Sequence, residues 1–357
     1  MKIGILTYHN AYNYGAVLQC FALQEYLSAL GNEVSVIDYR NTWVEGIYKP
    51  FSFNILKCYI QNPRTFLKYL LGYFKRKKEY QKKKQIYSDF LLNYLNIKTE
   101  ANSLECFETY DIIFIGSDQL WGLSCLGGKF DEIYLGNFDS KNVKLVGYAI
   151  SADLKSLKAL NESNRLISSL KNFTFFSLRE KNNAKYVSDI AKKDIDVCVD
   201  PTLLLSYEGW NRITNTKWKN KNYVVVYQVR FTEKQKSYLI EMAKDAARQF
   251  GEDCCVIDLS DGYEVSDFVS IIKYANLVIT SSFHATVFSL IFKTKFYSIE
   301  LGDGNDSRYA SLLHDLNLDE RLIKVGGKLQ DVNLPLPSYS LDVISCKSVE
   351  FIKASLR

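Results

Sequence analysis

The chain has 357 residues, of which 47% are hydrophobic and 24% charged, with a formal net charge of +5. This composition is typical of a folded globular protein, and the length exceeds what one hydrophobic core usually supports, so we expect two domains. No apolar stretch reaches the roughly 18 residues of a membrane span, and the N-terminal apolar stretch is too short for a signal peptide. We therefore expect a cytoplasmic protein.

Cysteine and histidine usage argues against a metal protein. The eight cysteines and three histidines form neither a CxxC pair nor a cluster with metal-ligand spacing. We expect the cysteines to be reduced and structural, and we expect no metal ion.

Elements of the first half alternate between strand and helix. Residues 2–7 have the pattern of a buried strand, apolar residues recur at helical spacing over 16–30, and Gly31 is a natural helix stop before a strand at 33–39. Such a β-α-β unit predicts a parallel sheet. Further strands are expected at 111–116, 144–149, 173–178 and 195–199, with a helix over 156–171.

Positive charge is concentrated between Lys57 and Phe90, where lysines and arginines face only Glu79 and Asp89. Tyr, Phe and Leu are interleaved at roughly helical spacing, which predicts one or two amphipathic helices in an insertion at about 55–95. Two interpretations stay open: peripheral contact with an anionic membrane, or a solvated helix face. We expect no nucleic-acid binding, because the charge is local and no recognition motif accompanies it.

A second α/β set follows a polar stretch that ends at about Asn222. The expected strands are 223–228, 255–259, 277–280 and 296–300, and the expected helices are 233–250, 266–274, 287–292 and 307–316. The economical prediction is two doubly wound domains, at residues 1–205 and 206–344. A final helix at 345–357 is expected to pack back on the first domain.

Ligands of open parallel sheets bind beyond the carboxyl ends of the strands, so the loops that follow strands are the places to search. His284 lies in such a loop, Thr280 to Thr286, in the first turn of a helix whose N-terminus favours anions. A histidine there can exchange protons near neutral pH. Capping contacts are the alternative role, and position alone leaves both open.

Other loops after strands also carry polar residues that a core would not need. Arg308, in a glycine-containing loop, can fork onto a carboxylate or phosphate, or can be an ordinary surface arginine. Arg179 ends another strand, where a surface ion pair is the alternative. The candidate sugar contacts are Asp118, Gln119 and Trp121 after one strand, and the loop with Asn13, Tyr14 and Gly15 before the first helix.

Taken together and in order, these motifs resemble the polysaccharide pyruvyl transferase family. The likeness runs from residues 3–7 and 13–19 through 116–121, 177–180, 200–204 and 282–288 to Arg308. Two departures are visible: Ala285 stands where glycine is common, and 151–153 is a looser match to a Ser-Phe-Gly turn.

The resemblance implies a GT-B-like α/β fold, with two Rossmann-like domains whose parallel sheets face a central cleft. It implies transfer of an enolpyruvyl group from phosphoenolpyruvate to a sugar of a surface polysaccharide or its lipid-linked precursor, forming a pyruvate ketal. By this similarity His284 is the catalytic histidine and Arg179 is a catalytic, phosphoenolpyruvate-binding arginine expected to face it across the cleft. The expected donor contacts are Arg179, Ser282, Phe283, His284 and Arg308.

Phosphoenolpyruvate is then a substrate, and no further cofactor is expected. The acceptor would be a saccharide, and a lipid-linked acceptor would suit a location on the inner face of the plasma membrane. Two rivals remain. One is a nucleotide-sugar glycosyltransferase of the same fold that uses Glu300 and the Gly302 loop; the other is a non-catalytic saccharide-binding protein.

Overall fold

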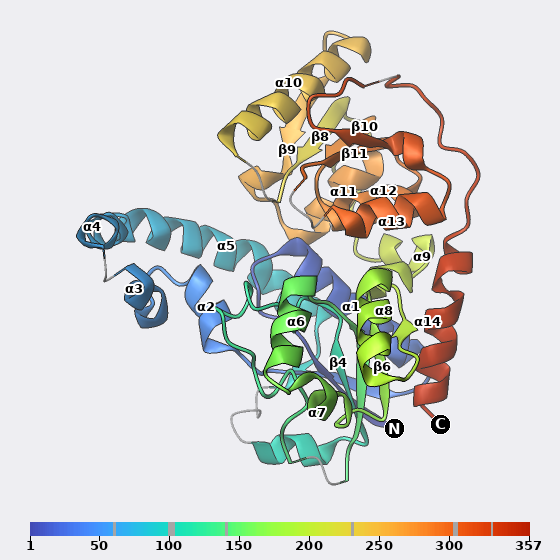
Figure 1. Cartoon of the computed structure of the whole chain (residues 1–357). Coiled ribbons are helices and arrows are strands. Elements are labelled where there is room, and N and C mark those ends of the chain that lie inside the picture. Colours follow the sequence, from blue (N-terminus) through green and yellow to red (C-terminus); the bar gives the residue numbers. More distant parts are fainter. Residues whose placement is uncertain (60–61, 99–103, 140–141, 230–231, 303–305, 330) are drawn as a thin grey trace. The chain divides into compact units, whose positions relative to one another are not determined.

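The computed structural model describes residues 1–59, 62–98, 104–139, 142–229, 232–302, 306–329 and 331–357 (Figure 1). It divides into two compact units, residues 1–204 with 345–357 (unit 1) and residues 205–344 (unit 2). Among the described residues, no helix is both long and apolar enough to cross a bilayer.

Unit 1 is built around a seven-stranded sheet with the order β3-β2-β1-β4-β5-β6-β7. All of its pairings are parallel. Its strands are β1 (Lys2–Leu6), β2 (Glu33–Ile37), β3 (Ile97–Lys98), β4 (Ile112–Gly116), β5 (Lys144–Ile150), β6 (Phe175–Leu178) and β7 (Asp196–Val197). Its helices are α1 (Tyr14–Ala29), α2 (Thr42–Tyr48), α3 (Phe53–Tyr59), α4 (Pro63–Leu71), α5 (Tyr73–Tyr94), α6 (Leu154–Glu162), α7 (Leu166–Leu170) and α8 (Lys181–Ala191).

Unit 2 contains a five-stranded parallel sheet with the order β12-β11-β10-β8-β9. Its strands are β8 (Tyr223–Tyr227), β9 (Cys255–Asp258), β10 (Leu277–Thr280), β11 (Phe296–Glu300) and β12 (Leu322–Lys324). Its helices are α9 (Tyr207–Asn211), α10 (Glu233–Gln249), α11 (Val265–Tyr274), α12 (Phe283–Phe292) and α13 (Ser307–Asp315). The last helix, α14 (Leu341–Ser355), enters unit 1, where the Ser348 hydroxyl accepts a hydrogen bond from the Val199 N–H.

The prediction of two α/β domains with parallel sheets is confirmed. The central strands have near-continuous apolar sequences because helices cover both faces of a parallel sheet. In unit 1 Ile113, Ile115 and Leu145 are 2% exposed or less, and in unit 2 Val224 and Ile279 are fully buried. Each such side chain stabilises its core by about 1.5–3 kcal/mol.

Three expectations about elements need correction. The described residues of the insertion, 53–59 and 62–94, form three helices (α3, α4 and α5), where one or two were expected. The helix expected over 156–171 is two helices, α6 and α7, which are separated by Asn164 with a positive φ of 57°. The short edge strands β3 and β12 were missed, because two or three residues are too few to show an alternating pattern.

The strand order fixes where ligands are expected in each unit. In unit 1 the chain moves from β1 to β2 on one side and returns to β4 on the other, so the order reverses between β1 and β4. In unit 2 it reverses between β8 and β10. Ligands of doubly wound sheets bind at such switch points, beyond the carboxyl ends of the strands.

Candidate active site

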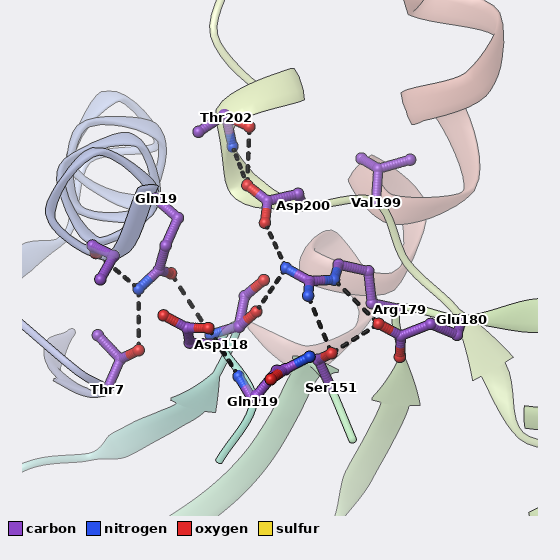
Figure 2. A network of polar contacts seen from close by, with 12 residues as sticks. Thr7, Gln19, Asp118, Gln119, Ser151, Arg179, Glu180, Val199, Asp200 and Thr202 are labelled. Atoms are coloured by element: carbon purple, nitrogen blue, oxygen red, sulfur yellow. Dashed lines mark hydrogen bonds and ion pairs between the residues drawn. The ribbon is translucent and has the colours of Figure 1, made fainter. Parts of the chain in front are cut away.

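Arg179 is the centre of a polar network at the carboxyl edge of the unit 1 sheet (Figure 2). It follows β6, its N–H donates to the Ile150 carbonyl, and its side chain is only 5% exposed. One terminal nitrogen, Nη1, donates to Asp200 Oδ2 at 2.7 Å and to the Ser117 carbonyl at 3.2 Å. Nη2 donates to the Ser151 hydroxyl at 2.9 Å, and Nε to Glu180 Oε1 at 3.3 Å.

Both carboxylates of the network have further contacts. Asp200, which is fully buried, accepts hydrogen bonds at Oδ1 from the N–H and the hydroxyl of Thr202. Glu180 Oε1 also accepts from the Ser151 hydroxyl at 2.6 Å. Within the described residues, Glu180 Oε2 and the Ser117 hydroxyl are buried and have no hydrogen-bond partner. Polar atoms of this kind often mark a place where water or a ligand binds.

The network keeps Arg179 charged. Burial by itself lowers the pKa of its guanidinium, but the charges of Glu180, Asp200 and Asp118 outweigh burial and raise that pKa above its usual value. At least four of the five guanidinium N–H groups have partners inside the protein. A substrate carboxylate that binds Arg179 at these positions must therefore replace one of these partners.

The loop after β4 carries two of the predicted sugar contacts. Asp118 and Gln119 are half-buried, the Gln119 N–H donates to Asp118 Oδ1 at 2.8 Å, and the Ser151 N–H donates to the Asp118 carbonyl at 3.1 Å. The loop thus lies beside Arg179, at the switch point of unit 1 (Figure 2).

Trp121, the third predicted sugar contact of this loop, is part of the core. Its indole is fully buried, donates to the Tyr134 carbonyl at 2.9 Å and packs against Phe176 with ring centroids 5.1 Å apart. A ring in that position has no free face for a sugar, so Trp121 is removed from the acceptor contacts.

The predicted sugar contacts in the loop before α1 and at its start, Asn13, Tyr14 and Gly15, mainly stabilise the start of that helix. Asn13 caps the helix by accepting the Ala16 N–H at 3.3 Å, and Tyr14, 5% exposed, contacts the Tyr87 ring of α5. Gly15 is buried in the first turn of α1. The loop's most exposed predicted contact is therefore the half-buried Asn13.

Gln19 belongs to this edge and was missed. It is 1% exposed, its amide donates to the Thr7 hydroxyl at 2.9 Å, and its carbonyl oxygen accepts the Ser117 N–H at 3.4 Å (Figure 2). It thereby connects the two loops that meet at the switch point. A glutamine among Ala16, Val17, Leu18 and Cys20 was the available sequence signal.

His284 lies where the sequence predicted it, in the first turn of α12 after β10, at the switch point of unit 2. Ser282 caps this helix by accepting the Ala285 N–H at 3.4 Å, Phe283 is 8% exposed, and His284 itself is half-buried. The Ser281 hydroxyl beside the helix start is buried and, within the described residues, has no hydrogen-bond partner. Its free hydrogen-bonding capacity adds to the anion-favouring field of the helix N-terminus.

Arg308 lies in the first turn of α13, after the neighbouring strand β11. Asp306, 3% exposed, accepts the Gly302 N–H at 2.6 Å and the hydroxyl of Tyr309, and so fixes the start of this helix. Residues 303–305 of the predicted loop, including Gly304, lie outside the described residues. Unit 2 therefore places His284, Ser282 and Arg308 on loops that follow adjacent strands. Their expected position opposite Arg179 stays a prediction.

Solved structures with a similar course of the chain include two epimerases and a heptosyltransferase. A UDP-GlcNAc 2-epimerase from Neisseria meningitidis is 10% identical with a TM-score of 0.48, over 99% of this chain and 100% of that one. A putative UDP-N-acetylglucosamine 2-epimerase from Listeria monocytogenes is 8% identical with a TM-score of 0.46, over 99% and 89%. The E. coli heptosyltransferase WaaC is 7% identical with a TM-score of 0.38, over 99% and 99%. Likenesses this weak carry no inference about ligand or activity.

Family membership rests on the sequence. No curated protein matches the chain significantly. A family model described as polysaccharide pyruvyl transferase, however, matches residues 13–303. The match spans more than half of the chain and contains both Arg179 and His284. The chain belongs to the polysaccharide pyruvyl transferase family, and is thus a transferase of polysaccharide modification.

Proposed function

We propose that the protein transfers an enolpyruvyl group from phosphoenolpyruvate to two hydroxyls of a saccharide, giving a cyclic pyruvate ketal and inorganic phosphate. The observation that carries this proposal is the place of His284, within the family match, in the first turn of α12 at the switch point of unit 2. A titratable side chain and an anion-favouring helix N-terminus are thereby brought to one loop.

The chemistry requires one proton donor and sites for two anionic groups. His284 gives a proton to the methylene carbon of phosphoenolpyruvate, which makes the neighbouring carbon electrophilic. A sugar hydroxyl adds to that carbon and returns a proton to His284. The bond to the phosphate oxygen then breaks with its electron pair on the phosphate, and a second hydroxyl adds and gives its proton to that phosphate, which closes the ketal. The N-terminus of α12 and Arg308 are the groups in unit 2 that favour the donor's phosphate and carboxylate.

Unit 1 supplies the acceptor side of the proposal. Asp118 and Gln119 offer a carboxylate and an amide for hydroxyl groups, while Arg179 and Gln19 hold their loop in position. A donor-binding role for Arg179 remains part of the proposal, and at these positions it requires the substrate carboxylate to replace one of the partners that Arg179 has in the network. The scheme uses no metal and no cofactor beyond the donor substrate.

A lipid-linked acceptor would bring the protein to a membrane surface. Several large apolar side chains of α3, α4 and the start of α5 are exposed, among them Phe53 (72%), Leu71 (74%) and Phe74 (78%). Lys75, Lys77 and Lys78 follow directly in α5. Exposed apolar groups beside lysines suit the boundary of an anionic membrane, so we include peripheral membrane contact in the proposal.

The test is a comparison of His284→Ala with His314→Ala, a matched change at an exposed histidine of the same unit. The probe acceptors are methyl glycosides with free neighbouring or 4,6-hydroxyls, incubated with phosphoenolpyruvate. We expect the unaltered protein and His314→Ala to release phosphate and to add one pyruvate, less one water, to a glycoside. His284→Ala should keep its thermal unfolding profile and lose both products. Unchanged turnover in His284→Ala would remove His284 from the mechanism.

A further inference from the structure

A pocket of about 580 Å³ lies in unit 1, outside the Arg179 network. Its lining comes mainly from the loops after β1 and β2, from α2, and from α5 between Tyr80 and Leu92. We call it the α5 pocket. Its polar lining includes Asn10, Arg40, Glu45, Tyr80, Lys84 and Ser88. Its volume falls in the range of about 300–1,000 Å³ that is usual for small-molecule sites.

Three linked side chains, which run from the buried His9 through Asp38 to the 45% exposed Arg40, form part of the pocket lining. His9, 1% exposed, contacts Asp38 Oδ1 through Nε2 at 2.8 Å. Asp38 binds Arg40 in a two-pronged contact, from Nε at 2.6 Å and from Nη2 at 2.9 Å. Burial raises the Asp38 pKa, but the hydrogen bonds from His9 and Arg40 outweigh it and hold that pKa well below its usual value. The carboxylate therefore stays ionised at neutral pH and keeps Arg40 in one orientation.

Tyrosines hold α5 against the rest of unit 1. The ring of Tyr12, from the loop after β1, stacks on Tyr87 of α5 with centroids 5.6 Å apart. The same ring meets Tyr48 of α2 edge-on at 5.4 Å and Tyr80 of α5 at 5.8 Å. Tyr12, Tyr48 and Tyr80 also line the pocket, so aromatic and phenolic groups contribute to its wall. Aromatic rings beside hydrogen-bonding groups suit a ligand with C–H faces and hydroxyls, as in a sugar ring.

The charged residues of the α5 pocket indicate which kind of sugar it prefers. The cations Arg40, Lys49 and Lys84 line it against the two carboxylates Asp38 and Glu45. Arg40 is bound to Asp38, and Lys49 contacts Glu45 at 2.8 Å. Lys84 is exposed and has no ion-pair partner among the described residues. It is therefore the cation of the pocket that can bind an anionic ligand without breaking an internal contact.

We propose that the α5 pocket binds a saccharide unit that carries an anionic group, a phosphate or a carboxylate, with Lys84 and Arg40 contacting the anion. The tyrosines contact the sugar ring. The role of the pocket as an acceptor subsite rests on the proposed function, because a bound saccharide is an acceptor only if the protein transfers pyruvyl groups. The binding of an anionic saccharide to the pocket does not depend on that function. The insertion, through α5, then selects which saccharides the protein takes.

The test measures binding without phosphoenolpyruvate, by titration calorimetry or ligand-observed NMR. The probes are glucose 1-phosphate, glucuronate, methyl glucoside and inorganic phosphate. We expect at least one of the two anionic sugars to bind about tenfold more tightly than methyl glucoside and than phosphate, as one charge-assisted contact allows. The proposal would be overturned if neither anionic sugar bound more tightly than both methyl glucoside and inorganic phosphate, or if no sugar bound at all.

Variants assign the binding to this pocket. Lys84→Gln should weaken the anionic sugar about tenfold and leave the neutral glycoside unchanged, whereas Lys78→Gln, an exposed change on the same helix and outside the pocket lining, should change neither. Binding that is insensitive to Lys84→Gln overturns the assignment. His284→Ala should retain this binding, so a failure of pyruvyl transfer and a failure of the pocket give different results.

Discussion

Asp200 is the residue whose removal should best show how the Arg179 network contributes to stability. It is fully buried and pairs with Arg179, which is 5% exposed. Asp200→Asn preserves the shape and leaves an oxygen for the Thr202 contacts, but removes the charge that faces the guanidinium. Because a buried charge that loses its partner is costly, we predict a loss of about 3 kcal/mol in the free energy of unfolding, measured by urea denaturation.

Asp189→Asn is the matched control, because Asp189 is exposed on α8 of the same unit. A surface change of this kind should stay within about 0.5 kcal/mol of the unaltered protein. If Asp200→Asn were as stable as Asp189→Asn, the Asp200–Arg179 pair would contribute nothing net to the fold.

Single residues of the site differ in how far sequence could place them. His284 was predictable, because a four-residue apolar strand and the apolar run after it fix the turn between them. The partners of Arg179 were not, since Asp200 and Ser151 lie 21 and 28 positions away and meet it only through the order of strands β5, β6 and β7. For Trp121, polar neighbours in the sequence suggested exposure, whereas the fold turns its ring into the core.

The helix α5 has two halves that behave differently. In the second half, Tyr87 and Phe90 are buried, and Phe90 meets Phe21 of α1 with centroids 5.7 Å apart. The first half leaves Phe74 78% exposed, and in Figure 1 it reaches with α4 beyond the sheet. The sequence predicted the positive charge and the helical spacing of this segment. It did not predict which turns of α5 pack against unit 1 or where one helix ends and the next begins, because lysines are frequent throughout the segment.

Exposed apolar residues of α4 and α5 lead to a prediction about membranes. Burying Leu71 and Phe74 in a bilayer boundary can contribute about 1.5–3 kcal/mol each, and each nearby lysine about 1 kcal/mol on an anionic surface. We therefore expect the protein to float with vesicles that contain phosphatidylserine at low salt, and not with phosphatidylcholine alone. Leu71→Ser with Phe74→Ser, or glutamine at Lys75, Lys77 and Lys78, should abolish flotation.

Val343→Ser is the control for that experiment, because Val343 is 75% exposed but lies in α14, outside these helices. It should float as the unaltered protein does. If the doubly substituted α4–α5 variants still floated, the membrane contact would lie elsewhere and the exposed apolar residues would need another explanation.

At the scale of the whole molecule, the fold class followed from alternation of strands and helices, since long apolar strands and their connections repeat along the chain. The order of the strands did not follow, because short edge strands such as β3 and β12 carry almost no pattern. Each unit has its own sheet and its own core. Thermal unfolding can therefore show more than one transition, and one melting temperature need not describe the chain.

Ligand-dependent unfolding of the whole chain should separate pyruvyl transfer from its rivals. A ligand present at a hundredfold excess over its Kd stabilises the folded state by about 2.7 kcal/mol, enough to raise a transition of a unit this size by about 5 °C or more. The comparison uses Lys84→Gln protein, so that binding of a sugar phosphate in the α5 pocket does not contribute. We predict that phosphoenolpyruvate raises at least one transition, that UDP- and GDP-sugars raise none, and that adding His284→Ala reduces the shift. A nucleotide-sugar glycosyltransferase would give the opposite preference, and a saccharide-binding protein without catalysis would respond to neither donor. A shift by UDP- or GDP-sugars with none by phosphoenolpyruvate would therefore overturn the proposed function, while leaving the family's fold and the α5 pocket to be judged by their own tests.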